Sequence, residues 1–161
     1  MTKPLQWATT RNTVAAAIDA IRSAKVASFD LETTGLNAYA ADAAVSLAQF
    51  TIRDPDLTTF VVPLFHPDSP WRGTWRTVLT HLMLALDGVP LIGHNVKFDA
   101  VGIHATTGVD VSHQIAWDTM VAARMLDENS GAKLEDLCVR LLGAPSWGKT
   151  EIHALMNRPG G

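Results

Sequence analysis

The sequence has a single cysteine, Cys138, among its 161 residues. One thiol can form neither an internal disulfide nor a cysteine-rich zinc site, and such sparing use of cysteine fits a reducing, cytoplasmic compartment. Every apolar run is too short to span a membrane, and Met1 to Gln6 lacks the apolar core of a signal peptide. These absences predict a cytoplasmic protein with no membrane partner.

Basic residues are not in excess. The 13 Lys and Arg are outnumbered by 16 Asp and Glu, which gives a formal net charge of −3. This balance argues against a protein that coats nucleic acid by charge alone, but it does not exclude an enzyme that meets phosphates through metal ions. The length suits one domain with a real core.

Apolar periodicity predicts strands first, and then strands alternating with helices. The expected strands are Leu5–Thr9 at an edge, Val26 to Glu32, Ala44–Ile52, Thr58–Pro63, Val89–Gly93 and Ile115–Trp117. The expected helices are Thr13–Ser23, Trp71 or Trp75 to Leu86, Lys97 to Thr106, Met120–Leu126 and Lys133–Leu142. This order predicts an α/β fold with a mixed sheet, antiparallel in its first three main strands and then parallel, with helices on both faces.

Two acids end the first main strand, in the stretch V-A-S-F-D-L-E-T-T-G-L from Val26 to Leu36. Because side chains alternate along a strand, Asp30 and Glu32 project side by side while Leu31 turns into the core. Paired carboxylates raise each other's pKa unless a cation compensates, and Mg²⁺ favours such oxygen ligands. The alternative is a strand end with two solvated acids.

The second informative stretch is L-I-G-H-N-V-K-F-D-A, from Leu91 to Ala100. Asn95 and Asp99 are four residues apart and share one face of the expected helix, with Phe98 beside Asp99. The alternative is an ordinary helix start with Asn95 near its cap. Both stretches lie at the carboxyl ends of predicted strands, where sites in such sheets are usually found.

Taken together, F-D-L-E-T-T-G-L and G-H-N-V-K-F-D resemble the first two motifs of the DEDD 3′–5′ exonucleases. The resemblance is closest to the proofreading domain of family A DNA polymerases, and it extends from Val26 to Leu142 with W-D-T-M at Trp117–Met120. It implies a ribonuclease H-like fold, with residues 1–161 as a single exonuclease domain. The implied reaction is hydrolysis of the terminal phosphodiester of single-stranded DNA, releasing nucleoside monophosphates.

The resemblance also assigns roles to residues. Asp30 would bridge two divalent ions, Mg²⁺ or Mn²⁺, while Glu32 would hold the ion that activates water and Asp99 would hold the other. Asp118 would be structural, tying its strand end to a helix. The residues expected to bind the 3′ end of the DNA are Thr33 and Thr34 through their amides, Leu36 as a wedge, Asn95 and Phe98.

The family's third motif, Tyr-x-x-x-Asp or His-x-x-x-x-Asp on a later helix, has no good match here. The only tyrosine is Tyr39, and His113 to Asp118 fits on paper but lies too close to Asp99. We therefore expect a domain that lacks its C-terminal helices and the fourth carboxylate. Such a domain should have impaired activity, and its exposed apolar surface favours self-association. The resemblance also implies that it works with a polymerase domain, in the same or another chain.

Three alternatives stay open from the sequence. Gly143 to Thr150 satisfies the P-loop pattern G-x-x-x-x-G-K-T, although a predicted helix rather than a strand precedes it. The enzyme could instead trim RNA in the manner of ribonuclease D. The chain could also be a non-catalytic fragment that binds nucleic acid or a polymerase.

Overall fold

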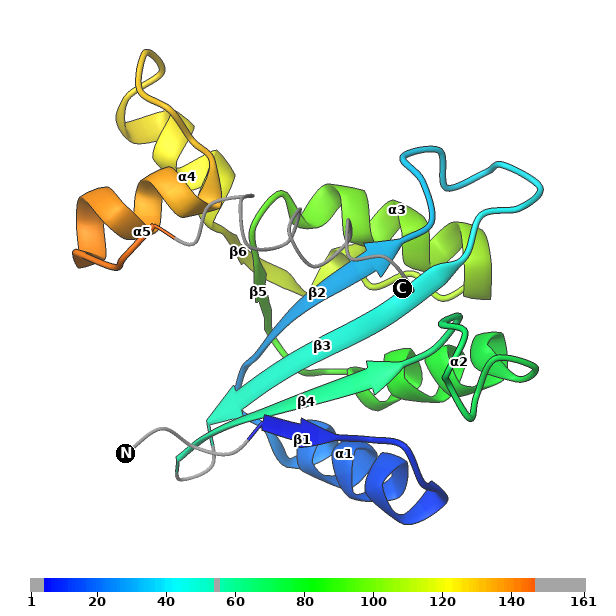
Figure 1. The fold of residues 1–161 in the computed structure, drawn as a ribbon. Helices are drawn as coiled ribbons and strands as arrows, with labels where there is room; N and C mark the ends of the chain where they lie inside the picture. The colour runs from blue at the N-terminus through cyan, green and yellow to red at the C-terminus, as the bar shows by residue number, and fades with distance from the viewer. Residues whose placement is uncertain (1–4, 54–55, 147–161) are drawn as a thin grey trace, which may run out of the picture. The chain divides into compact units, whose positions relative to one another are not determined.

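The computed structural model describes residues 5–53 and 56–146. The chain divides into two compact units, the first ending at Asp118 and the second beginning at Thr119. The strands of the first unit are β1 (Leu5–Trp7), β2 (Ala27–Thr33), β3 (Val45–Arg53), β4 (Leu57–Pro63), β5 (Leu91–Gly93) and β6 (Ile115–Asp118) (Figure 1). Its helices are α1 (Arg11–Ser23), α2 (Trp75–Ala85) and α3 (Val96–Thr107), with a short 3₁₀ helix, η1 (Ser112–Gln114).

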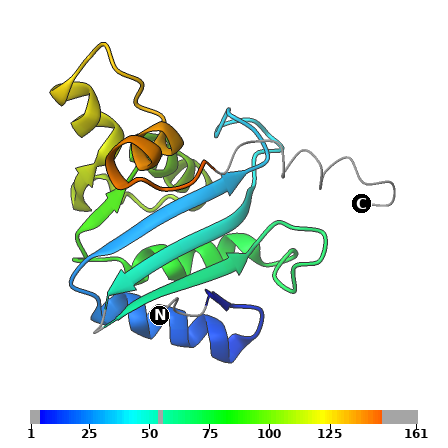
Figure 2. The same cartoon turned by 60° about the vertical axis from the view of Figure 1, so that its left-hand side comes forward.

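The six strands form one mixed sheet in the order β1-β4-β3-β2-β5-β6. The long strands β2, β3 and β4 are antiparallel neighbours, and they run side by side in Figure 2. Strand β1 pairs in parallel with β4, β5 with β2, and β6 with β5. All strands except β3 therefore end at one edge of the sheet, here called the carboxyl edge. The mixed sheet predicted from the sequence is confirmed.

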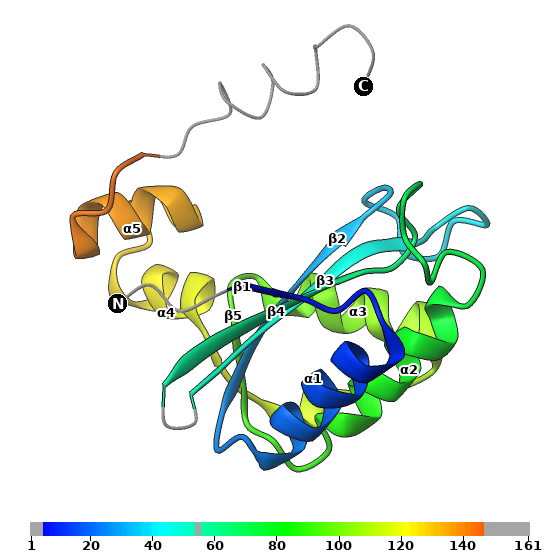
Figure 3. The same ribbon diagram turned by 60° about the horizontal axis from the view of Figure 1, so that its bottom comes forward.

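Helices α1, α2 and α3 lie side by side on one face of the sheet (Figure 3). Each connects two parallel strands, and each connection crosses the sheet in the same direction. Right-handed crossovers therefore place all three helices on the same face. Within residues 5–118 the α-helices therefore cover one face of the sheet, whereas helices on both faces were predicted.

The burial pattern of β2 follows from this one-sided cover. Phe29 and Leu31 are buried on the helix face, whereas Asp30 and Glu32 are exposed on the other face. Across the hairpin, Phe50 of β3 is opposite Phe29 and is fully buried, so the core lies between the sheet and the three helices.

Local signals set several helix boundaries as expected. Thr10 caps α1, because its Oγ1 accepts the Thr13 N–H at 3.2 Å and the Thr13 Oγ1 accepts the Thr10 N–H at 2.9 Å. Helix α2 begins at Trp75 and not at Trp71. The indole N–H of Trp71 instead donates to the carbonyl of Ala8 at 3.0 Å, a contact that fixes the loop before α2.

The second unit contains α4 (Thr119–Leu126) and α5 (Leu134–Leu142). Gly143 ends α5 in a left-handed conformation, with φ 63°, as a C-cap glycine does. A helix therefore precedes the G-x-x-x-x-G-K-T pattern, which disfavours a P-loop; residues 147–150 of the pattern lie outside the described part. Across residues 5–53 and 56–146, no helix has both the length and the apolar character needed to cross a membrane.

Candidate active site

The end of β2 presents two acids on the open face of the sheet. Asp30 stands opposite Gln49 of β3, and Glu32 stands opposite Leu47. The pairing register shifts directly after Glu32, so that Thr33 pairs with Val45. Irregularities of this kind twist a strand and redirect its side chains, and they are common beside active sites. The strand-end pair predicted from the D-x-E spacing is therefore present.

A third acid reaches the same strand from α3. Because β5 is short and pairs only with Ala27 and Ser28, the β2 edge beyond Ser28 has no strand partner on that side. The Leu31 N–H donates instead to Asp99 Oδ1 at 3.1 Å. Asp99 is only 5% exposed, so this bond holds its carboxylate against β2 between the positions of Asp30 and Glu32.

The three carboxylates influence one another's ionisation. Burial, and then the negative charge of Asp30, raise the pKa of Asp99 from 3.8 to about 7. Burial raises the pKa of Asp30, and burial together with the charge of Asp30 raises that of Glu32. Each acid is thus harder to ionise than in water, because the local field is negative and partly desolvated. A bound cation would relieve this field.

The donor set fits a hard divalent cation, because carboxylate oxygens are the ligands that Mg²⁺ and Mn²⁺ prefer. Within the described residues, no three acidic, histidine or cysteine side chains already stand in a ligating arrangement. Asp30, Glu32 and Asp99 would therefore have to draw closer around an ion.

Hydrogen bonds to the Asp118 carboxylate hold the start of α3 in place. One oxygen of its carboxylate accepts the Asn95 N–H at 3.0 Å, and the other accepts the Val96 N–H at 2.9 Å. These bonds satisfy two free amides of the first turn and tie the end of β6 to the helix that carries Asp99. The predicted structural role of Asp118 is confirmed, and its two oxygens are already engaged as acceptors.

Asn95 occupies the N-cap position, as expected for an ordinary helix start, but its side chain does not cap the helix. It is the only non-glycine residue with positive φ in the described ranges, at 56°. Asparagine tolerates this left-handed conformation better than most residues. The side chain of Asn95 is exposed, and the residue lies at the carboxyl edge after β5.

Comparison with known proteins identifies the family. Residues 5–157 match the family model described as 3′-5′ exonuclease. The chain belongs to this family. DNA polymerase I of Chloroflexus aurantiacus is 33% identical to the exonuclease domain over 143 residues, which make up 88% of this chain and 14% of that polymerase. The chain thus spans a small part of the length of this relative.

Solved structures share the fold of the exonuclease domain. The catalytic core of RRP6 from Trypanosoma brucei matches with a TM-score of 0.69 at 18% identity, covering 99% of this chain and 40% of that one. RNase D from Escherichia coli matches with a TM-score of 0.60 at 14% identity, covering 99% of this chain and 39% of that one. The predicted ribonuclease H-like fold is confirmed, and identities this low show the fold alone.

The residues predicted to bind substrate differ in how accessible the structure leaves them. Leu36 is 89% exposed, as a wedge residue should be. Thr33 and Phe98 line one small hollow together with Val45. The amide of Thr34, in contrast, donates to the carbonyl of Ala44 at 2.9 Å. A nucleotide could use that donor only by displacing Ala44, so the predicted Thr34 contact lacks a free amide.

Sequence reasoning gave no role to His94. Because β5 runs parallel to β2, the residue that follows β5 comes close to Asp30, and the charge of His94 opposes the rise in the pKa of Asp30. Within the described residues, His94 is the side chain that lowers the pKa of Asp30. The position of His94 after a strand could be read from the sequence, but its proximity to Asp30 could not.

Proposed function

We propose that this domain hydrolyses the terminal phosphodiester at the 3′ end of single-stranded DNA and releases nucleoside monophosphates. The observation that carries the proposal is Asp99, a nearly buried acid held against β2, where the charges of Asp30 and Glu32 help to raise its pKa. Membership of the 3′–5′ exonuclease family supports the reaction and its polarity.

Asp30, Glu32 and Asp99 would hold two divalent ions, Mg²⁺ or Mn²⁺. Such ions supply activation of the attacking water and stabilisation of the leaving 3′ oxygen. The bond from Leu31 fixes the orientation of Asp99, and His94 lowers the pKa of Asp30. Leu36 and Phe98 would hold the terminal bases apart, while Thr33 and Asn95 border the same edge.

DNA is the substrate we propose first, because the 33% identical relative is a DNA polymerase. On this view the domain proofreads for a polymerase domain in the same or another chain, in a reducing cytoplasmic compartment. Trimming of RNA is the second candidate, since the fold is shared with an exoribonuclease involved in structured RNA processing.

The test is a hydrolysis assay on one oligonucleotide sequence, prepared as DNA and as RNA, with Mg²⁺ or Mn²⁺. A 5′-labelled oligonucleotide should give a ladder of products shortened from the 3′ end. A 3′-labelled oligonucleotide should release its label as a mononucleotide in the first cleavage. We expect a slow rate, because the sequence offers three matching carboxylates where the family uses four.

Two controls make this assay decisive. Glu32→Gln should abolish turnover while preserving the fold, because Glu32 is exposed at the strand end. An oligonucleotide with a 3′ phosphate should resist cleavage. Internal cuts, or equal cleavage of the blocked substrate, would refute exonuclease action, and faster turnover of RNA would favour the second candidate.

A further inference from the structure

Two arginines near the carboxyl edge are stacked on aromatic rings. The guanidinium carbon of Arg72 lies 5.3 Å from the centre of the Phe65 ring, and that of Arg76 lies 4.3 Å from the centre of the Trp75 ring. The two rings contact each other, with centroids 6.0 Å apart. We call Phe65, Arg72, Trp75 and Arg76 the arginine ledge.

The arginine ledge has a buried aromatic base and exposed arginine side chains. Trp75 is only 5% exposed, whereas both arginines are exposed. Within the described residues neither guanidinium forms an ion pair, and the nearby Asp68 is instead close to His66. The contacts hold each guanidinium group over its ring, and the N–H donors that face away from the ring suit bidentate contact with phosphate.

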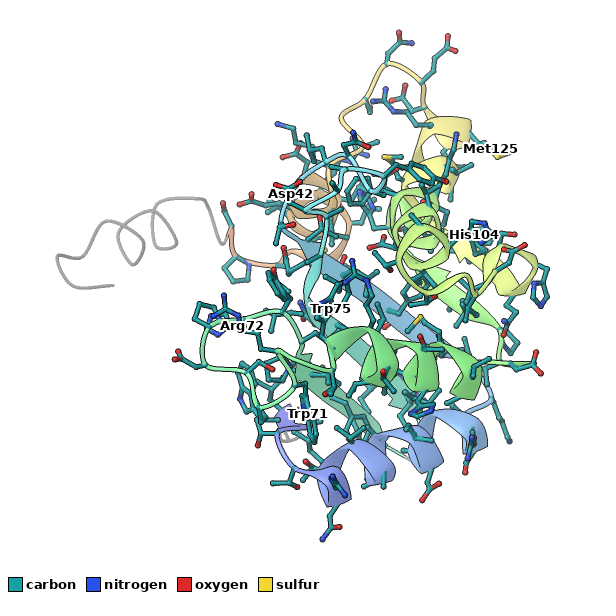
Figure 4. The ribbon with its side chains drawn as sticks, turned by 90° about the vertical axis from the view of Figure 1, so that its right-hand side faces the viewer. Asp42, Trp71, Arg72, Trp75, His104 and Met125 are labelled. Carbon is teal, nitrogen blue, oxygen red and sulfur yellow. The ribbon has the colours of Figure 1, made fainter. Side chains whose placement is uncertain are left out.

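The ledge is joined to the candidate active site through the sheet. Phe65 follows the carboxyl end of β4, and its N–H donates to the carbonyl of Val45 at 3.0 Å. Val45 pairs with Thr33, the last residue of β2. Two strand spacings, about 10 Å, therefore separate the backbone of Phe65 from the end of β2. Figure 1 shows the loops after β2 and β4 leaving the same edge, and Figure 4 marks Arg72 and Trp75 there.

We propose that the arginine ledge binds the phosphodiester backbone of the single-stranded substrate a few nucleotides upstream of its 3′ end. This inference rests on the proposed function, since it takes the 3′ end to lie at Asp30, Glu32 and Asp99. Contact with phosphates makes the ledge independent of base sequence. It also explains how a chain with net charge −3 can hold an anionic strand at one local site.

The ledge predicts binding that depends on substrate length. Affinities of the 161-residue chain for fluorescent dT2, dT8 and rU8 are measured in EDTA, so that no cleavage occurs. Arg72→Gln/Arg76→Gln should weaken dT8 binding about tenfold and leave dT2 unchanged. The dependence of log K on log salt should fall by about 1.4, which corresponds to two phosphate contacts to a single strand. An equal loss for rU8 identifies the shared backbone as the ligand, and a loss for dT8 alone identifies DNA.

Matched variants distinguish the loss of phosphate contacts from a loss of folded structure. Arg22→Gln/Arg53→Gln removes two exposed arginines at the opposite edge of the sheet and should leave dT8 affinity unchanged. Arg72→Lys/Arg76→Lys retains charge without planar stacking, and should restore most of the salt dependence and part of the affinity. Melting temperatures of all variants confirm that each is folded.

The outcomes separate this inference from the proposed function. If Arg72→Gln/Arg76→Gln binds dT8 with wild-type affinity and salt dependence, or weakens dT2 as much as dT8, the ledge assignment is overturned even when the wild type cleaves DNA. If the length-selective loss is found but the wild type cleaves nothing with Mg²⁺ or Mn²⁺, the ledge stands and the proposed reaction fails.

Discussion

Asp99 is the residue on which the electrostatics of the site depend. Its pKa is about 7 in the folded chain against 3.8 when solvated, mainly because of burial and then because of Asp30. Between these two values the folded state binds a proton that the unfolded state has released. Stability must therefore fall as pH rises from about 4 to about 7, and the loss is complete above that window.

The first prediction compares two substitutions of Asp99 in metal-free buffer. Asp99→Asn keeps an oxygen that can accept the Leu31 N–H and removes the buried charge, so it should raise the melting temperature at pH 8 but not at pH 4. Asp99→Ala leaves the Leu31 N–H without its partner and should cost about 1–3 kcal/mol at pH 4, where the wild-type carboxyl is neutral. A lower melting temperature for Asp99→Asn than for the wild type at pH 8 would contradict the assigned pKa.

Leu36 is exposed enough to serve substrate and not the core. Leu36→Ala should leave the melting temperature unchanged and weaken binding of single-stranded DNA about tenfold, in line with about 1–3 kcal/mol for contact with an unstacked base. Leu57→Ala, which removes a half-exposed leucine at the far end of β4, is the control and should change neither quantity. Equal losses of binding for the two variants would remove Leu36 from the site.

At the scale of elements, the position of α3 depends on its close approach to the end of β5. A Cβ atom on Gly93 would lie 3.0 Å from Cβ and 3.1 Å from Cγ2 of Val96, and 3.5 Å from the Phe29 carbonyl oxygen. Together with the Asp118 carboxylate, this contact sets where the first turn of α3 lies, and hence where Asp99 meets β2.

Two glycine substitutions should therefore act in opposite directions. Gly93→Ala must push Val96 and the start of α3 aside, which should cost about 1–3 kcal/mol and reduce turnover beyond the loss of stability. Gly102→Ala, within α3 and with nothing within 4 Å of the new Cβ, should stabilise the fold by up to about 1 kcal/mol. Thermal unfolding measures both, and a neutral Gly93→Ala would show that the approach is not tight.

Periodicity predicted the elements that bear the site, but not how they meet. Strand β2 and helix α3 lie within about a residue of their expected bounds, because alternation and helical spacing are local signals. The direction of β1 and the approach of His94 to Asp30 both depend on which strands pair, and this is not a local signal. The bonded amide of Thr34 depends on the shifted register that follows Glu32, which no local pattern reveals.

At the scale of the whole molecule, two distant stretches of sequence meet because β5 pairs with β2. Asp30 and Glu32 come from the first motif, and α3 returns Asp99 across 68 residues of sequence to the same strand. The match to the 3′-5′ exonuclease family extends to residue 157 and so includes most of the second unit. The proposed function requires these three carboxylates to bind divalent cations together.

Thermal unfolding with increasing Mn²⁺ tests that claim most directly, because it reports binding without requiring turnover. A ligand that binds the native state alone adds about 2.7 kcal/mol of stability at one hundred times its dissociation constant. The wild type should therefore gain melting temperature with Mn²⁺, while Asp30→Asn should show little or no gain and Asp110→Asn, an exposed acid outside the site, should gain as the wild type does. An unchanged Mn²⁺ response in Asp30→Asn would contradict the account.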